Sequence, residues 1–518
     1  MTEAPAQFSK LRAFFWPVHR HELHKLIPML VIFFLLSFDY NILRCLKDTL
    51  IVTAEHSGAE VIPFIKVWVM FPLSVALAYI YVRVSNRFSR ENVFYIMLSI
   101  FLSYFAIFAL LLYPNREALH CHETADKLQT ILPAGCKGLI AMYRYWSFTL
   151  FYALADLWSN IILALLFWGF ANQVTELSEA KRFYGLFGLG TNFSGVAAGQ
   201  ISIFITMLPF YPSLGLGSDA WAQSITILLF LIVVAGLITM AAFRWLNVKV
   251  LKTPSVICPD TQKVIQPEKK KHSMRENLRY VLTSSYVLSI ALIIIAYNVV
   301  INLVEVLWKH EVRELYPNPQ NYNIYMNEVT TVIGVMATLM ALFISGNLIR
   351  KFGWTFTALV TPVILLVTSI GFFGFFFFKD HPQMILSVFG VSPLVLVVFF
   401  GSMQNCCSRA AKYTVFDATK EMAFIPLTAE EKIKGKAAVD GVCNRLGKSG
   451  GSVIYNVLLL TFASIPASAP YVALFLMVII GLWIMCVRLL GSKFNAITQA
   501  IQEERVTQQN TRPATAAA

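Results

Sequence analysis

The chain has 518 residues and a formal net charge of +13; 57% of its residues are hydrophobic and only 14% are charged. Ordinary soluble domains are about 45–50% apolar and about 25% charged. The composition therefore excludes a soluble globular protein and indicates an integral membrane protein. The excess of Lys and Arg does not require a nucleic-acid partner, because such residues collect in the cytoplasmic loops of membrane proteins.

Residues 1–25 form a polar and basic segment that precedes the first apolar run at Leu26. This run is longer than the apolar part of a signal peptide, and no small-residue cleavage site follows it. We therefore expect an uncleaved first helix in a bacterial inner (cell) membrane.

Twelve apolar runs are long enough to cross a bilayer, which takes about 20 residues per helix. Several of them contain Gly, Asn or a charged residue, and none of the chain resembles a strand-rich domain. The sequence predicts an all-α, multi-pass membrane protein. The expected spans are 26–45, 62–83, 93–113, 146–171, 184–208, 222–245, 284–307, 329–350, 355–378, 384–408, 437–463 and 470–490.

Basic loops fall on alternate sides of these spans, which predicts that this side, with both termini, is cytoplasmic. The longest polar connection between the middle spans, 246–283, contains Lys269-Lys270-Lys271 and divides the spans six and six. A solvated linker is favoured over a lipid-binding patch for this run. The predicted organisation is a cytoplasmic segment 1–25, a six-helix bundle 26–245, a cytoplasmic linker 246–283, a second six-helix bundle 284–490 and a cytoplasmic polar tail 491–518.

A weak internal repeat agrees with this division. Residues 185–195 read GLFGLGTNFSG and residues 441–451 read GVCNRLGKSGG, so that glycines align between the fifth and eleventh spans. At nearly the same offset, Lys47 in the first span corresponds to Glu305 in the seventh. Two six-helix halves are typical of major-facilitator transporters, and we expect that architecture.

Charged residues inside the spans are the strongest functional signal. A charge at mid-bilayer costs about 2.5–3.5 kcal/mol on insertion scales, and such residues usually face a polar pathway. Arg44 and Lys47 lie three residues apart in the first span and can face one cavity, although a basic helix end is an alternative. Asp156 and Glu305 could hold a lysine between substrates, carry a proton, accept a hydrogen bond from a ligand, or form a structural ion pair.

The eleventh span contains Asn444, Arg445 and the tripeptide Gly447-Lys448-Ser449. A phosphate loop would need a preceding strand and a glycine five residues before Gly447, and neither is present, so an ATP-hydrolysing enzyme is disfavoured. Lys448 and Arg445 nonetheless supply cationic donors suited to phosphate oxygens. Asn444 and Lys448 share a helix face. The alternative is a small-residue helix contact with Lys448 extending to the membrane surface.

The chain has 8 cysteines. Cys121 and Cys136 share one polar loop, where a disulfide and free thiols are both compatible with the sequence. His120-Cys121-His122-Glu123 has metal-binding residue types, but it lacks a second ligand cluster. We expect neither a metal site nor a cofactor.

Long motifs make the family resemblance specific. From about Phe14 to Phe494 the chain resembles the ATP/ADP translocases, or nucleotide transporters, of intracellular bacteria such as chlamydiae and rickettsiae and of plastids. The segments that carry the resemblance are ILRCLKDTLIVT (42–53), GAEVIPFIKVW (58–68), ALADLWSN (153–160), LFWGFANQ (166–173), INLVEVLWK (301–309), CSRAAKYTVFDATKEMAFIPL (407–427) and KGKAAVDGVCNRLGKSGG (434–451).

The resemblance implies a secondary transporter, not an enzyme, that moves nucleotides across a bilayer by alternating access. ATP/ADP-type exchange is the leading hypothesis, and proton-coupled import of a nucleotide such as GTP or UTP is the alternative. Phosphate or protons could then travel as co-substrate or counter-substrate.

Four charged residues match positions that are critical for transport in the family: Lys47, Asp156, Glu305 and Lys448. The chain departs from the exchangers at Asp156, which replaces Glu, at Cys45-Leu46, which replaces Asp-Thr, and at Arg445, which replaces Pro. We predict that substrate phosphates are bound by Lys47, Lys448, Arg445, Asn444 and Arg44. Asp156 and Glu305 are the predicted coupling or substrate carboxylates.

Overall fold

The fold was analysed in a computed structural model, which describes residues 18–175, 177–250, 274–343, 345–379 and 390–510. Within these residues the chain forms helices joined by turns and loops and contains no strand. This agrees with the predicted all-α membrane protein. The central segment of the predicted linker, including Lys269-Lys270-Lys271, lies outside the described residues, as does the start of the predicted span 384–408.

The first part of the chain begins with the short turn η1 (Arg20–Glu22) and continues through helices connected by short turns. These helices are α2 (Leu23–Val52), α3 (Val61–Phe64), α4 (Met70–Arg87), α5 (Arg90–Ile107), α6 (Arg116–Leu119), α7 (His122–Ile131), α8 (Lys137–Arg144), α9 (Trp146–Trp158), α10 (Trp168–Val174), α11 (Leu177–Thr206) and α12 (Ala220–Trp245).

The second part contains the same kind of long apolar helices. Its helices are α13 (Met274–Thr283), α14 (Ser285–Leu315), α15 (Pro319–Phe343), α16 (Ser345–Phe377), α18 (Pro393–Ala411), α19 (Asp417–Ala423), α20 (Ala429–Ala438), α21 (Asn444–Phe462) and α22 (Ile465–Asn510). Helix α22 therefore continues well beyond the predicted span 470–490, and part of the predicted polar tail is helical.

Ten helices in the described ranges are long and apolar enough to cross a membrane. The sequence predicted twelve spans. The two predicted spans that do not meet this standard, 184–208 and 437–463, are helical as α11 and α21. Both contain several glycines and polar residues, and α21 also carries Arg445 and Lys448. Their mean hydropathy is therefore lower than that of an ordinary lipid-facing helix.

The packing differs from that of a soluble protein in its apolar surface and its buried charges. Large apolar side chains such as Phe71, Phe204 and Phe230 are exposed on the outside, while Asp48, Lys309 and many other polar side chains are buried. An apolar exterior, with charged residues placed among the apolar side chains of the interior, is expected where the surrounding medium is lipid.

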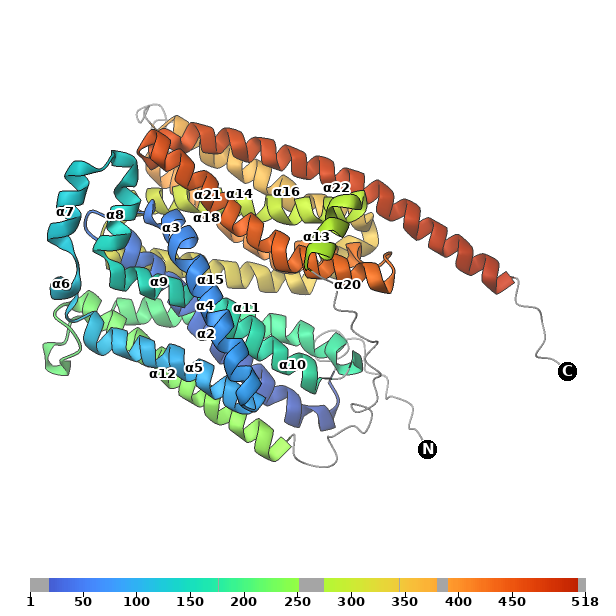
Figure 1. Cartoon of the computed structure of the whole chain (residues 1–518), viewed down its shortest axis with the longest axis horizontal. Coiled ribbons are helices and arrows are strands. Elements are labelled where there is room, and N and C mark those ends of the chain that lie inside the picture. Colours follow the sequence, from blue (N-terminus) through green and yellow to red (C-terminus); the bar gives the residue numbers. More distant parts are fainter. Residues whose placement is uncertain (1–17, 176, 251–273, 344, 380–389, 511–518) are drawn as a thin grey trace.

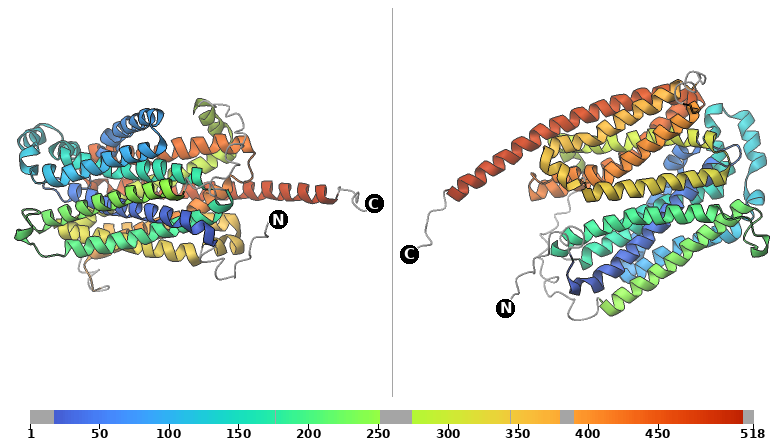
Figure 2. Two further views of the ribbon diagram at one scale, coloured as in Figure 1. Left: turned by 90° about the horizontal axis from the view of Figure 1, so that it is seen from below. Right: turned by 180° about the vertical axis from the view of Figure 1, so that it is seen from behind.

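Figure 1 shows the helices lying side by side along the long axis of the molecule. Helix α2 begins and helix α22 ends at the same end of this bundle, and α6, α7 and α8 cover the opposite end; the view from behind in Figure 2 agrees. The long helices α2 and α14 each lie inside the bundle. Helix α2 contacts α9, α11 and α12, and α14 contacts α18, α21 and α22.

A single glycine interrupts α16. Gly353 has φ 76° and ψ 177°, so the segment beginning at Ser345 and the helix that continues to Phe377 meet at a break. Residues other than glycine rarely adopt a positive φ of this kind.

We predict that Gly353→Ala lowers the free energy of unfolding by about 1–3 kcal/mol, because nothing crowds the position and the cost comes from the backbone alone. Gly374→Ala is the matched control, since Gly374 is helical and also has open space around it. This control should be neutral or slightly stabilising. Melting temperatures in detergent measure both effects, and equal values for the two variants would contradict the prediction.

Candidate functional site

The first ion pair of the candidate site joins Lys47 on α2 to Asp156 on α9. The Lys47 ammonium lies 2.7 Å from Asp156 Oδ1 and 3.9 Å from the centre of the Tyr152 ring. The Lys47 side chain is buried, whereas that of Asp156 remains 27% exposed. An ammonium taken out of water needs a counter-charge, and Asp156 supplies it while keeping one side open.

Three cationic side chains lie close to the carboxylate of Glu305 on α14. Its carboxylate lies 3.0 Å from Lys309, 3.2 Å from Arg409 of α18 and 4.0 Å from Lys66. Lys66 comes from the π-helical turn η2 (Ile65–Val69) and also donates a hydrogen bond of 2.6 Å to Asn302 Oδ1. Glu305 therefore connects residues from the first and second parts of the chain.

A fully buried pair links these two groups. Lys309 Nζ lies 2.8 Å from Asp48 Oδ2, and the two side chains are only 1% and 2% exposed. Asp48 is also 3.9 Å from Lys47. We call the seven connected residues the central ion-pair cluster: Lys47, Asp48, Lys66, Asp156, Glu305, Lys309 and Arg409.

Helix α21 packs against α14 through its small residues. A Cβ atom at Gly447 would lie 2.8 Å from Asn298 Cβ, and one at Gly451 would lie 3.0 Å from Asn302 Cβ. The glycines of the predicted phosphate-binding segment thus allow close helix packing. The tripeptide Gly447-Lys448-Ser449 lies inside a helix, which excludes a phosphate loop.

The same contact orients the polar face of α21. Asn298 Nδ2 donates to Asn444 Oδ1 at 2.9 Å, and Asn302 Nδ2 donates to the carbonyl oxygen of Lys448 at 3.3 Å. Lys448 is exposed, yet it interacts electrostatically with Asp156 and Arg409. Its ammonium is therefore on the side of α21 that faces the central ion-pair cluster.

Two other predicted cations differ in how close they come to this cluster. Arg44 is partly buried and interacts electrostatically with Tyr40 and Tyr413, and Tyr40 also interacts with Lys47 and Asp156. Arg445 is exposed on α21, and no described contact joins it to the cluster. In the described part of the chain, Arg44, Arg445 and Lys448 have no carboxylate within ion-pair distance.

π-helical turns lie next to several charged residues. Lys66 is inside η2, η5 (Ser159–Phe167) begins three residues after Asp156, η9 (Lys412–Phe416) begins three residues after Arg409, and η10 (Val439–Cys443) directly precedes Asn444. Such turns are rare and often occur at functional sites.

Sequence reasoning missed Asp48, Lys66, Lys309 and Arg409 as site residues. Lys66 interrupts an apolar run, which is the signal that marked Lys47. Lys309 is four residues after Glu305, a spacing that brings two side chains together on a helix. The Asp48–Lys309 pair joins two distant helices, and no local pattern could have revealed it.

The segment His120-Cys121-His122-Glu123, which has metal-binding residue types, is arranged by hydrogen bonding and aromatic packing. Cys121 and Cys136 are free thiols, and the described residues contain no cluster of metal-binding side chains. His120 Nε2 lies 2.8 Å from Ser147 Oγ, and the ring packs edge-on against Phe148. Burial lowers the pKa of His120 to about 4, so this histidine is neutral at physiological pH.

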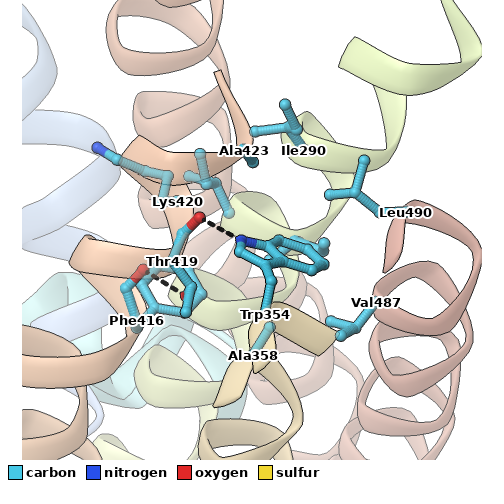
Figure 3. A pocket seen from close by; sticks show the side chains of 11 residues that line it. Ile290, Trp354, Ala358, Phe416, Thr419, Lys420, Ala423, Val487 and Leu490 are labelled. Atoms are coloured by element: carbon cyan, nitrogen blue, oxygen red, sulfur yellow. Dashed lines mark hydrogen bonds between the residues drawn. The ribbon is translucent and has the colours of Figure 1, made fainter. Parts of the chain in front are cut away.

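Figure 3 shows a small pocket elsewhere in the second part of the chain, lined mainly by apolar side chains of α14, α16, η9, α19 and α22, with Lys420 as its one charged residue. The indole nitrogen of Trp354 donates to the carbonyl oxygen of Thr419 at 2.9 Å, which closes one side of it. No member of the central ion-pair cluster lines this pocket. Its apolar lining does not suit a polyanion.

A bundle of membrane-spanning helices with charged residues inside is typical of a multi-pass membrane transporter. The overall fold agrees with this class. The xylose transporter XylE from E. coli, in a partially occluded inward-open conformation, superposes with a TM-score of 0.50 over 92% of this chain and 99% of its own, at 12% sequence identity. The predicted major-facilitator-like architecture is thus supported at the level of the fold.

Sequence comparison gives the family. A profile of the TLC ATP/ADP transporter family matches residues 1–494. ADP,ATP carrier protein 1 of Chlamydia pneumoniae is 45% identical over 508 residues, which cover 98% of each chain. The chloroplastic ADP,ATP carrier protein 1 of Arabidopsis thaliana is 38% identical over 483 residues, or 93% of this chain and 76% of the relative.

The chain belongs to the TLC ATP/ADP transporter family. This confirms the resemblance found from the motifs and the prediction of a transporter instead of an enzyme.

We predict that Asp48→Asn lowers the free energy of unfolding by about 3–5 kcal/mol, because it leaves the Lys309 ammonium buried without its closest carboxylate. The double variant Asp48→Asn/Lys309→Met should recover part of this loss. Lys137→Gln is the control, since the exposed Lys137 pairs with Glu60 at 3.3 Å and such pairs contribute about 1 kcal/mol or less. Thermal melting in detergent measures the stability of all three variants. If Asp48→Asn is as stable as the wild type, Asp48 is not the carboxylate that stabilises the buried Lys309 ammonium.

Proposed function

We propose that this protein carries nucleotides across a bacterial cell membrane by exchange, importing a nucleoside triphosphate and releasing a nucleotide by alternating access. The names of the relatives, which are ADP,ATP carriers in chlamydiae and in chloroplasts, support nucleotides as substrates. The proposal also rests on the charge balance of the site, described next.

Among the described residues, cations outnumber carboxylates at the central ion-pair cluster. Six basic side chains face or join the cluster, against three acidic ones: Arg44, Lys47, Lys66, Lys309, Arg409 and Lys448 compared with Asp48, Asp156 and Glu305. A positive excess in a region shielded from water favours a polyanionic ligand. This is the observation that most directly supports a nucleotide with its phosphates.

We assign the phosphate-binding role to Lys47 and Lys448, with Arg44, Asn444 and Arg445 as further donors along the path. Lys47 is held by Asp156 while no phosphate is present, and a phosphate oxygen would replace that carboxylate as its partner. Asp156 and Glu305 thereby keep the cations positioned between transport steps. This role for Asp156 uses its ionised form and so supports exchange over proton-coupled import.

Matching contacts in the two parts of the chain support a division into two six-helix bundles, 26–245 and 284–490. In this scheme α2, α9, α11 and α12 correspond to α14, α18, α21 and α22, because the first helix of each set contacts the other three. Helices α11 and α21 then count as the two remaining spans, and residues 1–25, 246–283 and 491–518 lie in the cytoplasm as N-terminal segment, linker and tail. The common end at which α2 begins and α22 ends supports this topology.

Contacts between the two bundles support alternating access. At the end covered by α8, a Cβ atom at Gly135 would lie 2.8 Å from backbone atoms of Leu459 and Leu460, and Asn456 Nδ2 donates to Pro63 O at 3.3 Å. The bundles thus touch closely at the end opposite the termini. A carrier closed there presents its site toward the cytoplasm.

We predict that Lys47→Ala and Lys448→Ala each reduce nucleotide uptake at least 10-fold. A hydrogen bond to a charged group contributes about 1.5–3 kcal/mol, and each 1.4 kcal/mol changes an equilibrium constant about tenfold. Uptake of labelled ATP by cells expressing each variant measures this effect, with membrane insertion checked by blotting. Lys137→Ala, at the exposed end of the bundle, should transport normally, and normal uptake by both site variants would remove them from the substrate path.

A second prediction distinguishes exchange from net import. Vesicles preloaded with unlabelled ADP should take up labelled ATP faster than empty vesicles, because each inward step then has an outward substrate. An uncoupler that collapses the pH gradient should leave this rate unchanged. Uptake that ignores preloading and follows the pH gradient would favour proton-coupled import instead.

A further inference from the structure

One carboxylate of α2 has no role in the ion-pair network. Asp39 is completely buried, and neither of its side-chain oxygens has a hydrogen-bond partner in the described structure. Among the described residues it also lacks an ion pair. It differs in this from Asp48, Asp156 and Glu305, each of which has a cation within 3.0 Å.

The surroundings of Asp39 are closely packed and apolar. One turn away on either side, Leu36 and Leu43 are fully buried. Trp158 donates from its indole nitrogen to the carbonyl oxygen of Leu36 at 3.0 Å, so α9 lies directly against this part of α2. Helices α11 and α12 also pack on α2.

Charged groups on these helices are engaged elsewhere. On α2, Lys25 pairs with Glu179 of α11, Lys47 pairs with Asp156 of α9, and Arg44 interacts with Tyr40 and Tyr413. Helix α15 and the π-helical turn η7 (Leu246–Val250) also pack on α2. The other described titratable groups on these elements are His24, Cys45 and Asp48 of α2, Tyr152 of α9, Arg182 and Tyr184 of α11, Arg244 of α12, Lys249 of η7, and Tyr322, Tyr325 and Glu328 of α15. None of these groups interacts electrostatically with Asp39. Burial alone therefore acts on the free energy of ionising its carboxyl group.

An ionised carboxylate without a partner in such a place would be very costly, and buried groups of this kind take up a proton and become neutral. A neutral carboxylic acid costs far less to bury, even without a hydrogen bond. The geometry around Asp39 therefore fits the protonated form only.

We propose that Asp39 is a proton-binding site of this transporter that is occupied in the conformation described here. The proton leaves when α2 moves relative to α9, α11 and α12 and water reaches the carboxyl group: the O–H bond of the acid breaks, and water accepts the proton as hydronium. The protonated form then stabilises the present conformation over one in which Asp39 is hydrated. The balance between the two conformations depends on pH through this residue, separately from nucleotide binding.

Infrared spectroscopy of the purified protein tests the protonation state without any transport. At neutral pH the wild type should show the C=O stretching band of a protonated carboxylic acid, and Asp39→Asn should lose that band. Asp440→Asn is the matched control: Asp440 is 44% exposed and pairs with Lys420 at 3.0 Å, so this variant should lose a carboxylate band only. Loss of a carboxylate band in Asp39→Asn would overturn the proposal.

Asp39→Glu provides a second variant if the Asn variant does not fold, and it should keep a protonated-acid band at a shifted frequency. A melting series gives an independent measure. The melting temperature of the wild type should fall as the pH is raised, because keeping the proton on Asp39 becomes more costly. Asp440→Asn should show the same pH dependence as the wild type. Asp39→Asn should not show it. Parallel pH dependences in the wild type and Asp39→Asn would also overturn the proposal. Neither experiment uses a nucleotide, so its failure is distinct from failure of the proposed exchange.

Discussion

The high cost of an unpaired charge away from water is the constraint on which the rest of this structure depends. Lys47, Lys309 and Arg409 can lie inside a lipid-embedded bundle because Asp156, Asp48 and Glu305 lie within about 3 Å of them. The fully buried Asp48–Lys309 pair connects α2 to α14. The same set of side chains therefore holds the two central helices together and places positive charge where a ligand could bind.

The surrounding packing serves this arrangement. Gly447 and Gly451 let α21 approach α14 closely, and the contacts of Asn298 and Asn302 then direct Lys448 toward the cluster. The likeness to the xylose transporter XylE agrees with this arrangement only at the level of the fold. A ligand would meet side chains from several helices at once, so recognition depends on the relative position of those helices.

Much of this could be predicted from the sequence, because lipid imposes simple rules on length and hydropathy. The helical segments and the unusual charges of Lys47, Asp156, Glu305 and Lys448 within them were visible in the apolar runs and the motifs. The pairing of Asp48 with Lys309 and the isolation of Asp39 were not, because both depend on which faces of distant helices meet. Ten of the twelve predicted spans meet the standard of length and apolarity in the described residues; α11 and α21 do not, because they combine a spanning length with the glycines and polar groups that close packing requires.

The π-helical turns have a mechanical consequence. Each contains one residue more than an α-helical turn, so moving that extra residue along the helix rotates the intervening side chains by about 100° without unwinding it. Lys66 lies within such a turn and Arg409 just before another. Both could exchange Glu305 for a new partner through a local slip in register, a far smaller movement than the displacement of a whole helix.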